Sequence, residues 1–510
     1  MTLAVLSGVL GFMAFPPFEV SILGWVALAP LLLAVRSCSA KEALAYSYAA
    51  GLVFFAGLLY WLVNVSVPGY MILVIYMAVF YALFGAAANL VFRYNMDIMA
   101  LPFVWVVLEY VRAHLFTGFP WGLLGYSQYK NLSFIQIADV TGAYGVSFLA
   151  LSFNVAMFAI LARSRRKVHY TLTSLVLVVV ALLYGAQRTS DHTMWGNVRL
   201  AVVQGNIPQE NKWDPDSAED ILKIYSELTA RAAQDKPDMI IWPESSYPYL
   251  VGKSEDLPDE VRFMASQAGV PLLAGIVDSE GDKCYNSAFL FDDRGALAGK
   301  YSKLHLVPWG EYVPFERFFS FVRGIVDKPI GNFNVGEKEV LLPLRVTRMS
   351  EASGAITRST SFYKFGVLIC FEDVFPYISR EAVYNGANFL VNITNDAWFG
   401  DTAAPTQHLQ ASVFRAVENR VPVIRAANTG VSCFISPTGE ISSRVHENGK
   451  DIFVRGISTA NVDIWRGRTY YVRHGDHFVL FCVAMLGLFL FAGIFLTKRL
   501  KTDQESQWSL

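Results

Sequence analysis

Three residues that could perform acyl transfer through a cysteine each follow an apolar stretch of the chain. Glu244 comes after residues 239–242, and Cys370 comes after residues 365–369. Lys303 lies in a third stretch that is rich in aromatic and proline residues. A cysteine thiolate can attack a carbonyl, a carboxylate can take the thiol proton, and an ammonium can stabilise the oxyanion. If the fold brings them together, these residues would support a covalent thioester mechanism.

Each of these residues also has an ordinary structural interpretation. Taken singly, a capping or salt-bridged glutamate, a surface lysine and a buried inert cysteine are all more common than catalytic groups. We expect Cys370 to stand on a sharp strand-to-helix turn that exposes its sulfur, with the N–H of Phe371 as an oxyanion donor. A nearby helix N-terminus would favour the thiolate. Glu311 could orient Lys303, assist proton transfer or be structural.

Short β-branched runs that alternate with amphipathic stretches must position these residues. This alternation predicts an α/β layered sandwich, and such apolar strands suit sheets that are covered on both faces. Residues 350–361 form a polar insertion. The predicted strands are 198–204, 239–242, 272–276, 287–291, 365–369, 389–394, 423–427 and 432–436. The predicted helices are 218–234, 261–268, 377–385 and 406–420.

The N-terminal part of the chain has the composition of a membrane protein. Residues 1–190 contain 15 Asp, Glu, Lys or Arg residues, whereas residues 191–475 contain 64. A spanning helix needs about 20 apolar residues, and we expect about eight spans, although residues 2–35 could instead form one re-entrant hairpin. The candidate spans are 2–15, 18–35, 43–66, 70–92, 98–116, 141–162, 169–187 and 477–497.

Basic residues in the short loops predict the orientation of this bundle. With eight spans they all fall on one side, which is therefore cytoplasmic. Those residues are Arg36, Lys41, Arg93, Arg163, Arg165, Arg166, Lys167, Lys498, Arg499 and Lys501. We thus expect a transmembrane helical bundle of about seven spans at 1–190, an extracytoplasmic domain at 191–475, and a C-terminal span with a cytoplasmic tail at 476–510. In a bacterium with two membranes the domain would lie in the periplasm.

Two charged residues inside a predicted span need an explanation. Glu109 and Arg112 are three residues apart and share one helical face. Buried charges in a bilayer are expensive and often functional. We favour a structural ion pair here over a catalytic role.

Several motifs together resemble the nitrilase superfamily of carbon–nitrogen hydrolases. They are WPES at 242–245, KYSKLHLVPWGEYVP at 300–314, GVLICFED at 366–373 and VNITNDAWFG at 391–400. With membrane segments on both sides, the chain further resembles the apolipoprotein N-acyltransferase family. The stretches VVQGNIPQENKWDP (202–215), NDAWFGDTAAPTQHLQ (395–410) and RAANTGVS (425–432) extend the likeness.

The resemblance implies an αββα fold and assigns roles by position. Cys370 corresponds to the nucleophile, Glu244 to the general base and Lys303 to the oxyanion stabiliser. The remaining correspondences are accessory: the acidic residues Glu311 and Glu372, and Trp213 near a tryptophan that the family needs. Where the family often has a tyrosine after the nucleophile, this chain has Phe371, which keeps the backbone amide but removes a phenolic role.

The implied reaction moves the sn-1 acyl chain of a phospholipid, such as phosphatidylethanolamine, to Cys370 and then to the N-terminal amine of a diacylglyceryl-cysteine on an apolipoprotein. The implied location is the bacterial inner membrane, with the domain in the periplasm. Apart from the resemblance, the aromatic and proline-rich loops at 307–319 and 393–405 could act as lids or as lipid-contacting arms. We expect no metal, since the five cysteines fit no zinc pattern. We also expect no cofactor, and we expect the protein to be a monomer. A net charge of −1 argues against nucleic-acid binding.

Two other functions remain open at this level. A membrane-tethered amidase or nitrilase would use the same residues with water as the acceptor. A transporter or scaffold with a degenerate domain would not require them.

Overall fold

The computed structural model describes residues 1–190, 194–252, 257–312, 332–352, 355–465 and 467–507. The chain divides into two compact units. Unit 1 comprises Met1–Val63, Val67–Ser190 and His474–Leu510, and unit 2 comprises Asn64–Ser66 and Asp191–Arg473.

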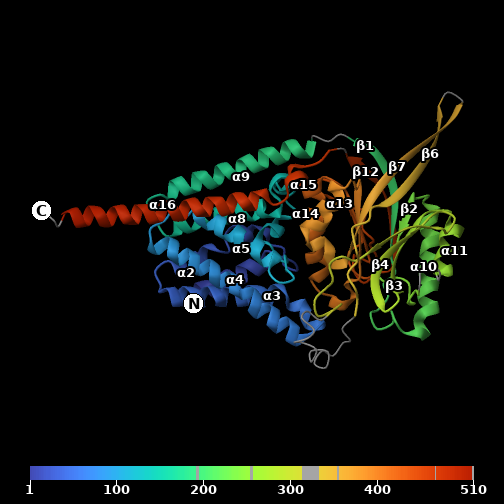
Figure 1. The fold of residues 1–510 in the computed structure, drawn as a ribbon, viewed down its shortest axis with the longest axis horizontal. Helices are drawn as coiled ribbons and strands as arrows, with labels where there is room; N and C mark the ends of the chain where they lie inside the picture. Colours follow the sequence, from blue (N-terminus) through green and yellow to red (C-terminus); the bar gives the residue numbers. More distant parts are fainter. Residues whose placement is uncertain (191–193, 253–256, 313–331, 353–354, 466, 508–510) are drawn as a thin grey trace. The chain divides into compact units, whose positions relative to one another are not determined.

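Unit 1 is a bundle of apolar helices (Figure 1). Among the described residues, three helices are long and apolar enough to cross a membrane: α4 (Val67–Arg93), α8 (Ala143–Leu161) and α9 (Lys167–Ser190). The other predicted spans correspond to α1 (Thr2–Met13), η1 (Ser21–Trp25) with α2 (Ala29–Val35), α3 (Ala40–Leu58), α5 (Ala100–His114) and α16 (His477–Gln507). The count of eight spans stays a prediction.

The segment 18–35 is not the continuous helix that we expected. It is divided into η1 and the seven-residue α2. The preceding α1 has 12 residues and is about 18 Å long at 1.5 Å per residue, which is short of the roughly 30 Å hydrocarbon core. These lengths favour the hairpin interpretation of residues 2–35.

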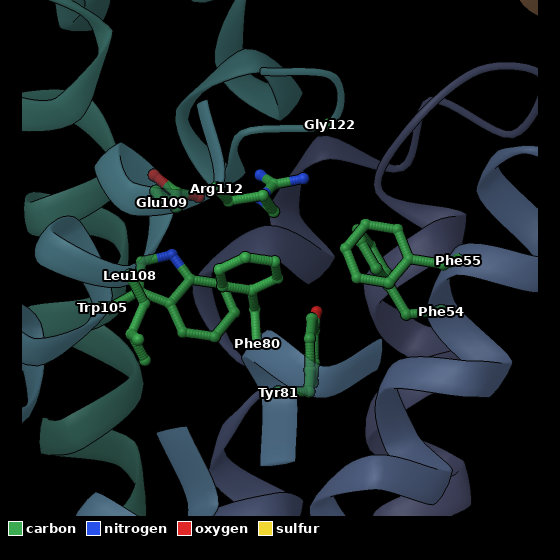
Figure 2. A pocket seen from close by; sticks show the side chains of 9 residues that line it. All are labelled: Phe54, Phe55, Phe80, Tyr81, Trp105, Leu108, Glu109, Arg112 and Gly122. Carbon is green, nitrogen blue, oxygen red and sulfur yellow. The ribbon is translucent and has the colours of Figure 1, made fainter. Parts of the chain in front are cut away.

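Glu109 and Arg112 lie together on α5, where both are buried (Figure 2). Glu109 Oε1 accepts a hydrogen bond from the Leu124 N–H at 2.7 Å, and Arg112 Nη1 donates to the Trp121 carbonyl at 2.7 Å. The adjoining cavity, of about 20 Å³, is lined mostly by aromatic side chains and holds about one water molecule. The two charges therefore fix the loop after α5, and the contacts support the structural interpretation.

Unit 2 contains two six-stranded sheets. The first has the order β12-β1-β2-β3-β4-β5 and the second the order β11-β10-β9-β8-β7-β6. The strands β1–β3 run parallel, as do β7–β9, and the outer pairs are antiparallel. Their bounds are β1 Met194–Gln204, β2 Met239–Ile241, β3 Leu272–Glu280, β4 Lys283–Phe291, β5 Leu297–Ser302, β6 Leu342–Ala352, β7 Ala355–Ile369, β8 Phe389–Thr394, β9 Val423–Ala427, β10 Cys433–Ile435, β11 Ile441–Ser442 and β12 Gly456–Trp465.

The sheets face each other and helices cover their outer faces (Figure 1). Along β1, Leu200 and Val202 join a core between the sheets, whereas Ala201 and Val203 join a second core with α10 (Ala218–Gln234) and α11 (Asp259–Ala268). This alternation follows from the period of two in a strand. The helices α13 (Pro376–Tyr384) and α14 (Ala404–Asn419) cover the second sheet. The nitrilase-like αββα arrangement is therefore present.

Four strands were not predicted: β5, β6, β11 and β12. All four are the edge strands of their sheets. Edge strands have one unpaired side and tolerate polar residues, so their sequences lack an apolar run. The polar insertion expected at 350–361 lies, in its described residues, along the β6–β7 pair of strands.

Candidate active site

Glu244 is delivered by the end of β2. Trp242 anchors this end, since its indole stacks on Tyr225 with centroids 4.7 Å apart and donates to Thr229 at 2.9 Å. Gly275 on β3 lies directly beneath the following turn, and a Cβ there would stand 2.4 Å from the Pro243 carbonyl oxygen. Only a glycine permits this close approach. The Glu244 side chain is buried at 6% exposure.

Both sheets hold the Glu244 carboxylate. Oε1 accepts a hydrogen bond from Asn286 Nδ2 on β4 at 2.7 Å, and Oε2 accepts one from the Asn395 N–H just after β8 at 2.9 Å. Lys303 Nζ lies 3.7 Å from Oε1. Each oxygen thus has a fixed partner, and the carboxylate has a defined orientation.

Lys303 follows β5 and is buried at 1% exposure. Its Nζ donates to Glu311 Oε1 at 2.9 Å, and Glu311 Oε2 accepts from the Val307 N–H at 2.7 Å. Burial opposes the charge, but Glu311, Glu244 and Cys370 outweigh it and raise the pKa of Lys303 above its ordinary value. Lys303 is therefore a fixed cation, and Glu311 orients it as one of our interpretations expected.

Cys370 begins the short helix η6 (Cys370–Val374) directly after β7, with a positive φ of 53°. This left-handed residue is the sharp turn that the sequence predicted. Glu372 stabilises the turn, because its carboxylate accepts hydrogen bonds from the Ile369 N–H at 2.7 Å and from the Leu304 N–H at 2.6 Å. Glu372 thereby joins the cysteine turn to the segment after Lys303. Burial raises the pKa of Glu372 to about 7.

Two expectations about the sulfur were wrong. Cys370 is only 9% exposed rather than presented on the surface. Burial, followed by the charge of Glu244, raises the pKa of its thiol well above the ordinary value, although Lys303 and a hydrogen bond with Thr394 oppose the change. The resting residue is a thiol, because the surrounding protein excludes the water that would solvate a thiolate. A base is consequently required to activate it.

The structure does not test the predicted roles of the other accessory residues, Phe371 and Trp213. Phe371 is half-buried, with its ring 5.1 Å from that of Phe375, and the oxyanion role of its N–H stays a prediction. Trp213 is 46% exposed, and its role also stays a prediction. Of the predicted lipid-contacting loops, residues 313–319 lie outside the described residues.

Three residues at the site were missed as individuals. Asn286 bridges Glu244 and Glu311, at 2.7 and 3.1 Å. Asn395 supplies the N–H that binds Glu244. Lys212 is buried and donates to the Glu244 carbonyl at 2.8 Å, and burial lowers its pKa to about 8. Lys212 and Asn395 fall inside the family-like stretches 202–215 and 391–400, so those motifs held the signal.

A buried cysteine on a left-handed turn, with a carboxylate and an ammonium, in a two-sheet sandwich defines a carbon–nitrogen hydrolase of the nitrilase type. The carbon–nitrogen hydrolase family pattern matches residues 199–467, and the pattern of the apolipoprotein N-acyltransferase N-terminal domain matches residues 7–156. The chain is 38% identical to apolipoprotein N-acyltransferase of Geobacter metallireducens, over 94% of this chain and 93% of the relative. The chain belongs to the apolipoprotein N-acyltransferase family.

The chain is also similar to a second relative and to solved structures. The enzyme of the same name from Pasteurella multocida is 30% identical over 98% of this chain and 96% of its own. Among solved structures, Saccharomyces cerevisiae Nit3 of the nitrilase superfamily covers 53% of this chain and 91% of its own, at 19% identity and a TM-score of 0.38. An amidase from Nesterenkonia sp. covers 55% and 94%, at 18% identity and a TM-score of 0.36.

Proposed function

We propose that this protein transfers the sn-1 acyl chain of a phospholipid, such as phosphatidylethanolamine, to the N-terminal amine of the diacylglyceryl-cysteine on apolipoproteins. The observation that carries the proposal is the buried Glu244–Lys303 pair, with 3.7 Å between Oε1 and Nζ, in the same domain as the buried Cys370, whose pKa both charges affect. These are the three groups that a thioester mechanism needs, and they lie in a chain that also has apolar helices of membrane-spanning length.

In the first half-reaction Glu244 takes the Cys370 proton, and the sulfur attacks the ester carbonyl of the phospholipid. The ammonium of Lys303, with the N–H of Phe371, stabilises the tetrahedral oxyanion. When the C–O bond breaks, Glu244 returns the proton to the leaving glyceryl alkoxide. The products are a lysophospholipid and an acyl thioester on Cys370.

In the second half-reaction the α-amine of the diacylglyceryl-cysteine attacks the thioester. Glu244 takes a proton from the attacking amine, and the same donors stabilise the second oxyanion. The C–S bond then breaks, and the sulfur regains the proton. Because a thiolate is a better leaving group than an amine, this intermediate collapses toward the amide.

The same proposal covers the setting of the enzyme. Residues 1–190 and the C-terminal helix anchor the protein in the bacterial inner membrane, with the catalytic domain in the periplasm, and the enzyme acts as a monomer. The asymmetry of basic residues between predicted loops supports this orientation.

Incubation of the purified full-length protein with phosphatidylethanolamine in detergent micelles tests the first step. Mass spectrometry should detect one added acyl group on the peptide that contains Cys370. Addition of a diacylglyceryl-cysteinyl peptide should then remove it and give an amide-linked product. The Cys370→Ala variant, a matched control, should acquire no acyl group. Free fatty acid or ammonia without an amide-linked product would instead favour a membrane-tethered amidase.

A further inference from the structure

A cluster of four charged side chains is buried beside the active site, outside the Glu244–Lys303–Cys370 set. His408 stands on α14 with Asp373 on one side and Asp396 on the other, and Arg425 on β9 completes the cluster. All four are at most 2% exposed. Removing four charges from water costs free energy, which only their mutual pairing can offset. The cluster is therefore expected to serve the fold or the function.

One aspartate belongs to the turn that carries Cys370, and the other belongs to the turn whose Asn395 N–H binds Glu244. Asp373 lies in η6, three residues after Cys370. Asp396 begins η7 (Asp396–Phe399) and directly follows Asn395, whose N–H binds Glu244. The Asp396 carboxylate also accepts from Thr394 Oγ1 at 3.2 Å, and Thr394 itself hydrogen-bonds the Cys370 sulfur. A link between the aspartates is therefore a link between nucleophile and base.

His408 makes that link through both of its ring nitrogens. Nε2 lies 2.7 Å from Asp373 Oδ1, and Nδ1 lies 3.1 Å from Asp396 Oδ1. An ionised carboxylate only accepts hydrogen bonds, and a neutral imidazole carries a single N–H. Only the doubly protonated ring can donate to both aspartates at once.

The surrounding charges favour this protonated form. Arg425 Nη1 donates to Asp373 Oδ2 at 2.7 Å and to Ser412 Oγ at 2.6 Å, so two cations balance two anions only when His408 is charged. The next charged residues on α14, Arg415 and Glu418, pair with each other at 2.8 Å. Burial disfavours the imidazolium, but Asp373 outweighs it, and the pKa of His408 rises to about 9.

One competing arrangement is a neutral ring. Arg425 Nη2 lies 3.4 Å from His408 Nδ1 and could donate to it, leaving Asp396 without a bond from His408. The shorter contact of 3.1 Å to Asp396 favours the charged form. The two arrangements differ in one measurable way, since only the charged ring loses a bond when the pH rises.

We propose that His408 is a positioning residue, whose imidazolium fixes the turn of Cys370 against the turn of Asn395 and Asp396 and so sets the geometry of the acylation step. This inference rests on the proposed function, because acylation of Cys370 is its readout. The acylation rate should therefore fall at alkaline pH, and this fall is the alkaline limb of the pH–rate profile. As His408 loses its proton, one of its two hydrogen bonds is lost and the two turns separate.

The test is the single-turnover rate of Cys370 acylation from pH 6 to pH 10, measured by mass spectrometry on the full-length protein with phosphatidylethanolamine micelles. Wild type should lose rate with an apparent pKa near 9. His408→Gln, which donates from one nitrogen only, should be about 10- to 100-fold slower at pH 7, with the half-saturating phospholipid concentration changed less than twofold and with no limb near pH 9.

Asp396→Asn is a second variant that tests the same inference even if His408→Gln fails to fold. The introduced amide can donate to the unprotonated Nδ1, so a neutral ring can still bridge both turns. Loss of the His408 proton then breaks no bond, so Asp396→Asn should show no fall in rate near pH 9. Lys212→Met tests a second group near the site that titrates on the alkaline side, with a pKa of about 8, and the fall in rate near pH 9 should remain in this variant.

A wild-type rate that holds steady up to pH 10 would establish the neutral arrangement and overturn the inference. An unchanged limb in both His408→Gln and Asp396→Asn would do the same, as would a His408→Gln defect confined to phospholipid binding. If wild type forms no acyl group on Cys370 at any pH, the proposed function itself fails.

Discussion

The close packing beneath Glu244 makes Gly275→Ala the most informative single substitution. A Cβ at this position would lie 2.4 Å from the Pro243 carbonyl oxygen and 2.7 Å from both Glu244 Cα and the Ser245 nitrogen. All three contacts are with backbone, so no side-chain rotation can relieve them. The main chain that carries Glu244 has to move.

The size of the movement follows from these distances. Ordinary contacts of a Cβ begin at 3.4 Å, so the Pro243 oxygen must retreat by about 1 Å. The Glu244 carboxylate would then lose its bonds of 2.7 Å to Asn286 and 2.9 Å to the Asn395 N–H. A displacement of about 1 Å in a catalytic group costs about 100-fold in rate. Overpacking of this kind also lowers the free energy of unfolding by about 1–3 kcal/mol.

Single-turnover acylation of Cys370 by phosphatidylethanolamine provides the assay, with thermal unfolding measured on the same samples. Gly275→Ala should acylate about 100-fold more slowly at a temperature where it is fully folded. Gly487→Ala is the control, because a Cβ there meets nothing within 4 Å. A Gly275→Ala rate within threefold of wild type would refute the claim that this packing sets the position of Glu244.

Three further substitutions probe the same site. Asn286→Asp places a third carboxylate between Glu244 and Glu311, and acylation should fall about 100-fold through like-charge repulsion; an unchanged rate would show that Asn286 does not orient the base. Lys212→Met removes a lysine whose pKa burial lowers to about 8. Because the unfolded chain holds that proton up to about pH 10.4, wild-type stability should rise between about pH 8 and pH 10.4, and the variant's unfolding temperature should rise less over this interval. Glu372→Ala leaves the N–H groups bonded to Glu372 without an acceptor, and both the unfolding temperature and acylation should fall; a wild-type unfolding temperature would contradict this.

The interior of unit 2 was predictable because its signals are local. The helix 218–234 and the strands 389–394 and 423–427 have the predicted bounds. Each is either strongly amphipathic or continuously apolar, so periodicity and hydrophobicity agree. The edge strands were not predicted, because pairing with a neighbouring strand, and not their own composition, holds them in the sheet.

The residues of the active site also differ in whether a local sequence signal identifies them. Glu244 and Cys370 were recognisable because each directly follows the apolar end of a strand, Glu244 in the first sheet and Cys370 in the second. Asn286 is a single polar residue near the start of a strand, and its importance depends on Glu244 and Glu311, which other parts of the chain supply. The protonation state of Cys370 was missed because the burial of a sulfur is a property of the completed fold.

The first and last strands of unit 2 pair side by side, with Met194 opposite Trp465 and β1 antiparallel to β12. Residues directly opposite in such a pair have Cα atoms about 4.5–5.5 Å apart. About 280 residues therefore leave the helical part and return through adjacent points, as an inserted module does. The two ends of this module therefore lie on neighbouring strands of the first sheet.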